Sequence, residues 1–259
     1  MDNERNPEHA AGVAGMIYKA AQLGTHEVTA EELKAINKHT LEPLEAADVF
    51  TFKAVLCDNE IDRDFERFSF KALQDLKKLF LGKTVIKNHS WNANDQVARI
   101  YATELVQSEK VTASGEPYTQ LVAHCYMVRT EGNKDLIAEI KGGIKREGSV
   151  GCAVSSSICS ICGTDNAKNY CRHYPGKFYE KEGGAQVCTF TLAGAKDAYE
   201  FSLVAVPAQK AAGVSKSYTG KTVYASAEED PAPADDTKEK EQAHLLGLRA
   251  RLAATRAKH

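Results

Sequence analysis

The stretch that decides the fold of this 259-residue chain is residues 198–208, Ala-Tyr-Glu-Phe-Ser-Leu-Val-Ala-Val-Pro-Ala. Its aromatic and β-branched residues predict a strand over Tyr199–Val206, because such side chains fit a pleated and buried surface. Glu200 stands at the start of this apolar strand. A carboxylate at that position is either exposed to water or held there for a chemical task.

Similar runs elsewhere predict a sheet of short strands with few helices. Further strands are expected around Val49–Leu56 and over Thr84–Lys87, Gln96–Val106, Tyr118–Val128, Ser149–Ser155 and Val187–Leu192. Helices are expected over Ala10–Leu23, from a capping box at Thr29 through Ile36, over Ser69–Phe80 and over Lys134–Ile140. These elements indicate an α+β fold with a small mixed or barrel-like sheet and a few flanking helices.

The composition excludes several classes of protein. With 33 basic and 35 acidic residues the net charge is −2, which excludes a globally basic nucleic-acid coat but not a local basic patch. The apolar runs are far shorter than the roughly 20 residues that span a bilayer, and the polar start MDNERNPEHAAG contains no signal core. Seven cysteines cannot all pair within one chain, so a secreted disulfide scaffold is not expected. Three of them, Cys57, Cys125 and Cys152, lie in apolar contexts and are interpreted as core residues.

The composition also divides the chain into four parts. Residues 1–45 are expected to form an N-terminal helical arm, and residues 46–216 a folded domain. Residues 217–242 are interpreted as a disordered acidic linker, because 226–242 contains seven acidic residues against two lysines. Residues 243–259 predict a short basic amphipathic helix with leucines on one side, which suits docking onto a partner.

A cluster of cysteines and a histidine marks the segment 158–190 as a metal-binding insertion. In Cys159-Ser-Ile-Cys162-Gly163, two thiolates can hold one tetrahedral ion, and the glycine permits the tight turn that follows. Cys171 and His173 can supply the other two ligands, and Cys188 is the alternative for the fourth position. Because the cluster has no accompanying water-activating glutamate, we interpret it as a structural zinc site.

Three reactive side chains lie beside predicted strands. His89 follows the strand Thr84–Lys87, Ser149 lies in Glu147-Gly-Ser-Val-Gly151, and Glu200 begins its own strand. A serine hydroxyl needs a base to become a nucleophile near neutral pH, and that base needs a partner that fixes its tautomer. The simpler interpretations are a serine in a glycine turn, a hydrogen-bonded histidine and a solvated glutamate, and spacing alone does not decide between them.

The order of these motifs resembles the prohead maturation proteases of tailed phages, which are serine proteases related in fold to the herpesvirus capsid assemblins. The resemblance covers roughly residues 46–216, and its most specific part is Glu200-x-Ser-x-Val-x-x-Pro-Ala208. It implies that Ser149 is the nucleophile, His89 the general base and Glu200 the residue that orients the imidazole. Two features depart from the family pattern. Asn88 and Ser90 flank the histidine where many members have an aspartate, and the zinc-like insertion marks a subgroup.

The resemblance also implies a biological setting. Such proteases are packaged inside the procapsid in the host cytoplasm, where they cleave scaffold or the scaffold-like arm of the major capsid protein, and then themselves. The implied partners are therefore the major capsid protein and the scaffold protein, with the portal as a further candidate. The assemblin relatives imply a homodimer or higher oligomer, and neither a membrane nor a nucleic-acid partner is expected.

Two alternatives of other classes are carried forward. One is a catalytically inactive capsid assembly or scaffolding protein that keeps the fold and the structural zinc site. The other is a zinc-finger nucleic-acid-binding module, because Lys168–Lys181 interleaves basic and aromatic residues that could contact phosphates and stack on bases.

Overall fold

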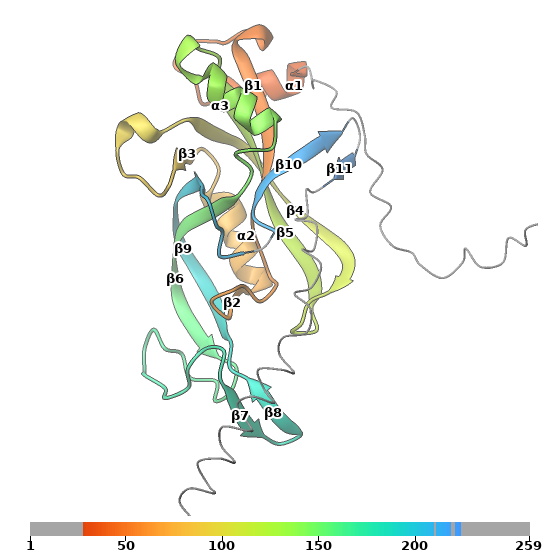
Figure 1. Cartoon of the computed structure of the whole chain (residues 1–259), viewed down its shortest axis with the longest axis vertical. Helices are drawn as coiled ribbons and strands as arrows, with labels where there is room; N and C mark the ends of the chain where they lie inside the picture. The colour runs from red at the N-terminus through yellow and green to blue at the C-terminus, as the bar shows by residue number, and fades with distance from the viewer. Residues whose placement is uncertain (1–27, 210, 219–220, 224–259) are drawn as a thin grey trace, which may run out of the picture.

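The computed structural model describes residues 28–209, 211–218 and 221–223 (Figure 1). The helix predicted over residues 10–23, most of the acidic linker and the basic C-terminal helix lie outside these residues. The prediction of disorder is wrong at the start of the linker, because residues 217–218 and 221–223 belong to two paired strands. Among the described residues, none of the helices combines the length and the apolar character that crossing a membrane requires.

Strands dominate the described part of the chain. The strands are β1 (Val49–Asp58), β2 (Glu66–Phe68), β3 (Thr84–Lys87), β4 (Ala98–Val111), β5 (Pro117–Val128), β6 (Gly148–Cys159), β7 (Phe178–Lys181), β8 (Gly184–Val187), β9 (Phe190–Leu203), β10 (Gly213–Tyr218) and β11 (Lys221–Val223). The helices are α1 (Ala30–Ile36), α2 (Phe70–Leu79) and α3 (Lys134–Lys141). The predicted α+β class is confirmed.

The main sheet is mixed, with neighbouring strands in the order β11-β10-β1-β5-β4-β3-β9-β2, and β6 pairs with β9. Strands β2 and β3 run parallel to β9, whereas β6 runs antiparallel to it. An isolated bridge between Glu147 and Gly213 joins the start of β6 to the start of β10. The sheet is therefore open along most of its length, and two strands distant in its order touch at one end.

Helix α2 lies within the curve of this sheet (Figure 1). Leu73 and Leu76, on the apolar side of this helix, are fully buried and belong to the main core together with Phe201 of β9. Ser69 caps the helix by accepting a hydrogen bond from the Ala72 amide, and the chain turns at Gly82 with φ +78°. The predicted helix over Ser69–Phe80 is confirmed in all but its terminal residues.

The structure also confirms the predicted cap of α1, the bounds of β3, the start of α3 and the packing of three cysteines in or against the core. Thr29 and Glu32 form the predicted capping box of α1, with the Thr29 hydroxyl accepting from the Glu32 amide at 3.2 Å. Strand β3 has the predicted bounds, and α3 begins at the predicted Lys134. Cys57 and Cys125 are fully buried, and Cys152 is half-buried against the same core.

The prediction of separate strands over Val187–Leu192 and Tyr199–Val206 is wrong, because one long strand, β9, spans Phe190–Leu203. The ladder of β9 with β6 shifts register between Gly151 and Cys152, whose partners are Glu200 and Ala198. Tyr199 is the extra residue of this β-bulge. The bulge breaks the two-residue alternation on which a sequence-based assignment of one continuous strand depends.

Candidate active site

Three strands meet at the C-terminal end of β9. On β9, Glu200 lies opposite Gly151 of β6, and Ser202 lies opposite Ser149 of β6. On the other edge of β9, the parallel strand β3 places Ile86 opposite Ser202. Paired residues on neighbouring strands share a face, and so do residues two apart on one strand. Ser149, Ser202 and Glu200 therefore lie on the same face of the sheet, the face opposite to that of the core residue Phe201.

His89 is brought onto this face by a sharp turn after β3. Asn88 and His89 both have left-handed backbones, with φ of 52° and 51°. Such conformations cost roughly 1–3 kcal/mol each outside glycine and persist only where other contacts enforce them. Here the Asn88 amide donates to the Leu203 carbonyl at 3.0 Å, and the His89 amide donates to the Ser202 hydroxyl at 2.8 Å. The last residues of β9 thus hold the backbone of the histidine.

The side chains of His89 and Glu200 are in direct contact. His89 Nδ1 lies 2.7 Å from Glu200 Oε1, a short hydrogen bond between residues 111 positions apart in the chain. The Glu200 side chain is only 5% exposed, whereas that of His89 is 45% exposed. With an ionised carboxylate, the proton resides on Nδ1 and the other ring nitrogen is left as a proton acceptor. This is the arrangement that a general base requires.

Two glycines around Ser149 are explained by this packing. A Cβ on Gly151 would lie 2.5 Å from Glu200 Oε1, and a Cβ on Gly148 would lie 2.1 Å from the ring of Phe201. Real Cβ atoms essentially never come so close to another heavy atom. The Gly-Ser-Val-Gly pattern is thus required by the close approach of β9, and a turn is not its reason, because Ser149 lies within strand β6.

Burial around Glu200 shapes the electrostatics of this site. Glu200 Oε2 is buried and makes no hydrogen bond with any described residue. Half-buried Cys152 follows Gly151 on β6, and burial together with the nearby Glu200 carboxylate raises the pKa of its thiol to about 11. The thiol is therefore neutral at physiological pH, which disfavours Cys152 as a nucleophile.

Ser149 is positioned but not hydrogen-bonded. Its side chain is half-buried, and among the described residues its hydroxyl has no hydrogen-bond partner, His89 included. The structure thus joins two of the three predicted catalytic residues directly and places the third across from Ser202 on the same face. Ser202 was missed by the sequence reasoning. The Glu-x-Ser spacing on a predicted strand could have found it, because residues two apart share a face.

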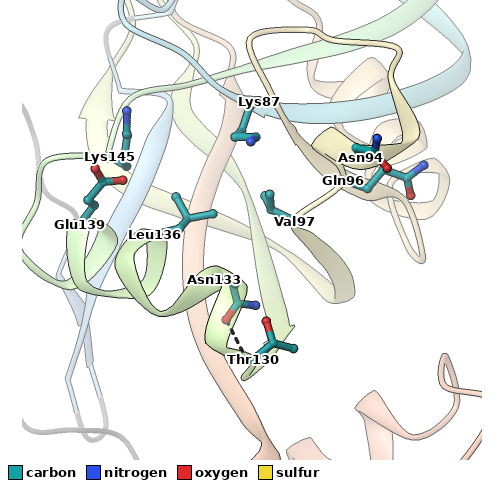
Figure 2. A pocket seen from close by; sticks show the side chains of 10 residues that line it. Lys87, Asn94, Gln96, Val97, Thr130, Asn133, Leu136, Glu139 and Lys145 are labelled. Carbon is teal, nitrogen blue, oxygen red and sulfur yellow. Dashed lines mark hydrogen bonds between the residues drawn. The ribbon is translucent and has the colours of Figure 1, made fainter.

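A separate pocket of about 500 Å³ opens at the end of β3 (Figure 2). Its walls come from the segment after β3, from α3 and the turn before it, and from Lys145. Lys87, two residues before His89, lines this pocket, but Ser149, His89 and Glu200 do not. The candidate active site therefore lies on the sheet face that carries Ser149 and Glu200, outside this pocket.

The predicted metal ligands also come together, at the far end of β6 and β9 near the β7–β8 hairpin (Figure 1). The ligand atoms of Cys159, Cys162, Cys171 and His173 all lie within 4.8 Å of one another. Cys159 Sγ is 3.7 Å from His173 Nδ1. Around a tetrahedral ion with metal–sulfur bonds of about 2.3 Å, ligand atoms are separated by about 3.8 Å. The cluster is compatible with a metal site on these distances.

Cys188 lies close enough to the cluster to be the fourth ligand in place of His173. Its fully buried thiol lies 3.8 Å from Cys159 Sγ, although it is not part of the mutually close group. Hydrogen bonds from the side chain and backbone of Thr164 lower the pKa of the Cys162 thiol to about 6, which favours the thiolate form that binds metals. His173 packs edge-on against Tyr179 with ring centroids 4.5 Å apart, which fixes the orientation of its ring.

No model of a known protein family matches the chain, and neither does a curated protein or a solved structure.

Proposed function

We propose that this protein is a serine endopeptidase that matures a phage prohead, with Ser149 as nucleophile, His89 as general base and Glu200 as the residue that orients the base. The observation that carries the proposal is the 2.7 Å hydrogen bond between His89 Nδ1 and the buried carboxylate of Glu200, made on the sheet face that also bears Ser149. A buried carboxylate bound to a half-exposed histidine is a costly arrangement, and such arrangements concentrate at functional sites.

The geometry supports a two-stage acyl transfer. His89 accepts the Ser149 proton through Nε2 while Ser149 Oγ attacks the scissile carbonyl, and the imidazolium that forms is stabilised by Glu200. The histidine then gives this proton to the leaving amine, and water releases the acyl group by the same route. General-base assistance of this kind contributes about 10²–10⁴-fold to the rate. A movement that brings Ser149 Oγ to His89 Nε2 is needed first, since their side chains are not hydrogen-bonded to each other.

The resemblance to prohead proteases supports the finer parts of the proposal. The proposed fold is assemblin-like, the proposed substrates are scaffold or the arm of the major capsid protein, and the protein acts inside the procapsid as a dimer or higher oligomer. The proposed ion in the cysteine–histidine cluster is structural zinc. It would tie the segment between β6 and β9 to the end of β6, where Cys159 lies.

Co-expression with genes for the proposed capsid and scaffold substrates tests the activity. Wild-type protein is expected to shorten the capsid or scaffold protein and its own chain, read by intact mass, whereas Ser149→Ala leaves all chains at full length. Ser155→Ala, six residues further along β6, is the matched control and should process normally. Processing by Ser149→Ala equal to that of the wild type would exclude Ser149 as the nucleophile.

A second candidate is the catalytically inactive assembly protein, and one observation favours it. The Ser149 hydroxyl makes no hydrogen bond to His89 or to any other described residue. Labelling by a fluorophosphonate, which reacts only with activated serines, separates the two candidates. Labelling of the wild type that is lost in His89→Ala supports the peptidase, and absence of labelling in the folded wild type supports the assembly protein.

A further inference from the structure

Two exposed aromatic side chains stand beside the candidate active site. Trp91 follows His89 by two residues and is 82% exposed, and Tyr199 directly precedes Glu200 and is 42% exposed. Their rings touch edge to face, with centroids 6.2 Å apart. Exposed tryptophan leaves a large apolar surface in water, and tryptophan and tyrosine are the residues most often used to anchor a partner.

The bulge in β9 is what presents Tyr199 on this face. Ala198 and Phe201 are both fully buried in the core although they are three residues apart. In a regular strand, residues three apart point to opposite faces, so the extra residue of the bulge lets both face inward. Tyr199 and Glu200 consequently both face away from the core. Regular alternation with Phe201 already turns Glu200 away from the core, and the bulge adds an aromatic ring beside it.

The segment that carries Trp91 is stiffened by its own hydrogen bonds. Ser90 Oγ donates to Asp95 Oδ2 at 2.6 Å, and the Asn92 amide donates to the Ser90 hydroxyl at 3.3 Å. Asp95 also pairs with Lys87 at 3.1 Å. Trp91 is thus held outward by a braced turn, which lowers the entropic cost of using it as a binding surface.

We infer that Trp91 and Tyr199 form a subsite that binds one apolar side chain, of leucine or phenylalanine size, of the peptide cleaved at Ser149. The inference rests on the proposed peptidase function and names a preference that this function alone does not supply. An apolar side chain is favoured because two aromatic surfaces offer dispersion and hydrophobic contact. Lys83 and Lys87, the lysines at the two ends of the β3 segment, are paired with Asp197 and Asp95, which disfavours a polyanion as the occupant.

The first experiment measures the preference. Acetylated, amidated decapeptides of alanine, serine and glycine are prepared with one Leu, Phe or Glu at each position in turn. Cleavage by the full-length protein, followed by mass spectrometry, is expected to favour Leu or Phe at one fixed distance from the cleaved bond by about tenfold or more in kcat/KM. Trp91→Ala and Tyr199→Ala should each abolish that preference, so that one variant cleaves the Leu, Phe and unsubstituted peptides with similar kcat/KM. Trp91→Phe should restore most of it.

The second experiment measures binding without catalysis. Trp91 is the only tryptophan of the chain, so its fluorescence reports directly on this surface. In the Ser149→Ala background, the same Leu and Phe peptides should shift the Trp91 emission to shorter wavelength with saturation, and the added change Tyr199→Ala should weaken binding about tenfold. Phe178→Ala is the matched control, because Phe178 is 71% exposed but belongs to the distant β7–β8 hairpin.

The outcomes separate the inference from the function on which it rests. Cleavage whose Leu or Phe preference survives Trp91→Ala and Tyr199→Ala overturns the inference and leaves the peptidase intact. Saturable Leu and Phe binding that depends on Tyr199, together with no cleavage of any peptide, upholds the subsite and contradicts the peptidase. If none of the peptides alters Trp91 emission, the inference is also overturned.

Discussion

Substitution of one glycine should uncouple the histidine from its glutamate without touching either residue. In Gly151→Ala the new Cβ would lie 2.5 Å from Glu200 Oε1, 3.3 Å from Cδ and 3.5 Å from Cγ. Ordinary contact begins at 3.4 Å, so the carboxylate must withdraw by about 0.9 Å. A shift of that size is enough to carry the 2.7 Å bond to His89 beyond the limit of about 3.5 Å at which a hydrogen bond is lost.

The expected consequence is a loss of activity larger than the loss of stability. Misplacing a catalytic group by about 1 Å typically costs about 100-fold in rate. Overpacking a well-packed site costs about 1–3 kcal/mol in the free energy of unfolding, which leaves a domain of this size folded. We therefore expect Gly151→Ala to lower the rate of fluorophosphonate labelling of Ser149, and of peptide cleavage, by about 100-fold, with a lower but cooperative thermal transition.

A second glycine provides the control. Gly132 has an ordinary backbone, and a Cβ there would meet only the Thr130 hydroxyl at 3.9 Å. Gly132→Ala should label and melt as the wild type does. Glu200→Gln, which keeps the volume but removes the charge, should resemble Gly151→Ala in activity. Wild-type labelling by Gly151→Ala would refute the argument that Glu200 acts through its contact with His89.

Three further predictions concern the metal site, pH and the second serine. If His173 is the fourth ligand, elemental analysis should show that His173→Ala loses most of its bound zinc while Cys188→Ser keeps one equivalent, and the reverse result assigns Cys188. Chelation should also lower the melting temperature, since structural zinc contributes about 10–16 kcal/mol of apparent binding free energy. Burial raises the pKa of Asp58 to about 6, so protonated Asp58 stabilises the folded protein below pH 4, and this stability is lost as the pH rises through about 6. In urea unfolding at pH 4 and 7.5, Asp58→Asn should reduce the difference in unfolding free energy between the two pH values by up to about 3 kcal/mol. An unchanged difference contradicts the assignment. Ser202→Ala leaves the His89 amide without its hydrogen-bond acceptor, so it should lower the free energy of unfolding in urea by about 1–3 kcal/mol and slow the labelling of Ser149. Stability and labelling equal to the wild type would show that the 2.8 Å hydrogen bond does not hold His89 in place.

The elements that the sequence predicted well are those whose signals are local. The capping box at Thr29, the cap at Ser69 and the bounds of β3 depend on residues within one or two turns of one another. The candidate metal ligands Cys159 and Cys162 were recognisable for the same reason, since two residues of spacing suffice to place two thiolates around one ion. Cys188 was an open alternative in the sequence and remains one, because its distance from the cluster is set by the pairing of β6 with β9.

The errors of sequence reasoning lie where pairing between distant strands decides the outcome. Strand β9 was divided into two because its bulge breaks the alternation, and only the ladder with β6 shows that Tyr199 is the extra residue. The β7–β8 hairpin was missed because its side chains are mostly exposed and carry no apolar period. Ser202 was not singled out because its role is to accept a hydrogen bond from a residue 113 positions away.

The sequence by itself therefore determined the α+β class, the capped helices, the spacing of the metal ligands and the identity of three candidate catalytic residues. The resemblance implied that Glu200 orients His89, but only the tertiary structure supplies their contact. It also requires Gly151 to lack a side chain and places Trp91 and Tyr199 beside the pair. The physical reason is that helix caps and ligand spacings are short-range properties of the chain. The site, in contrast, depends on the register of β3, β9 and β6, which is fixed only when the whole sheet packs around its core.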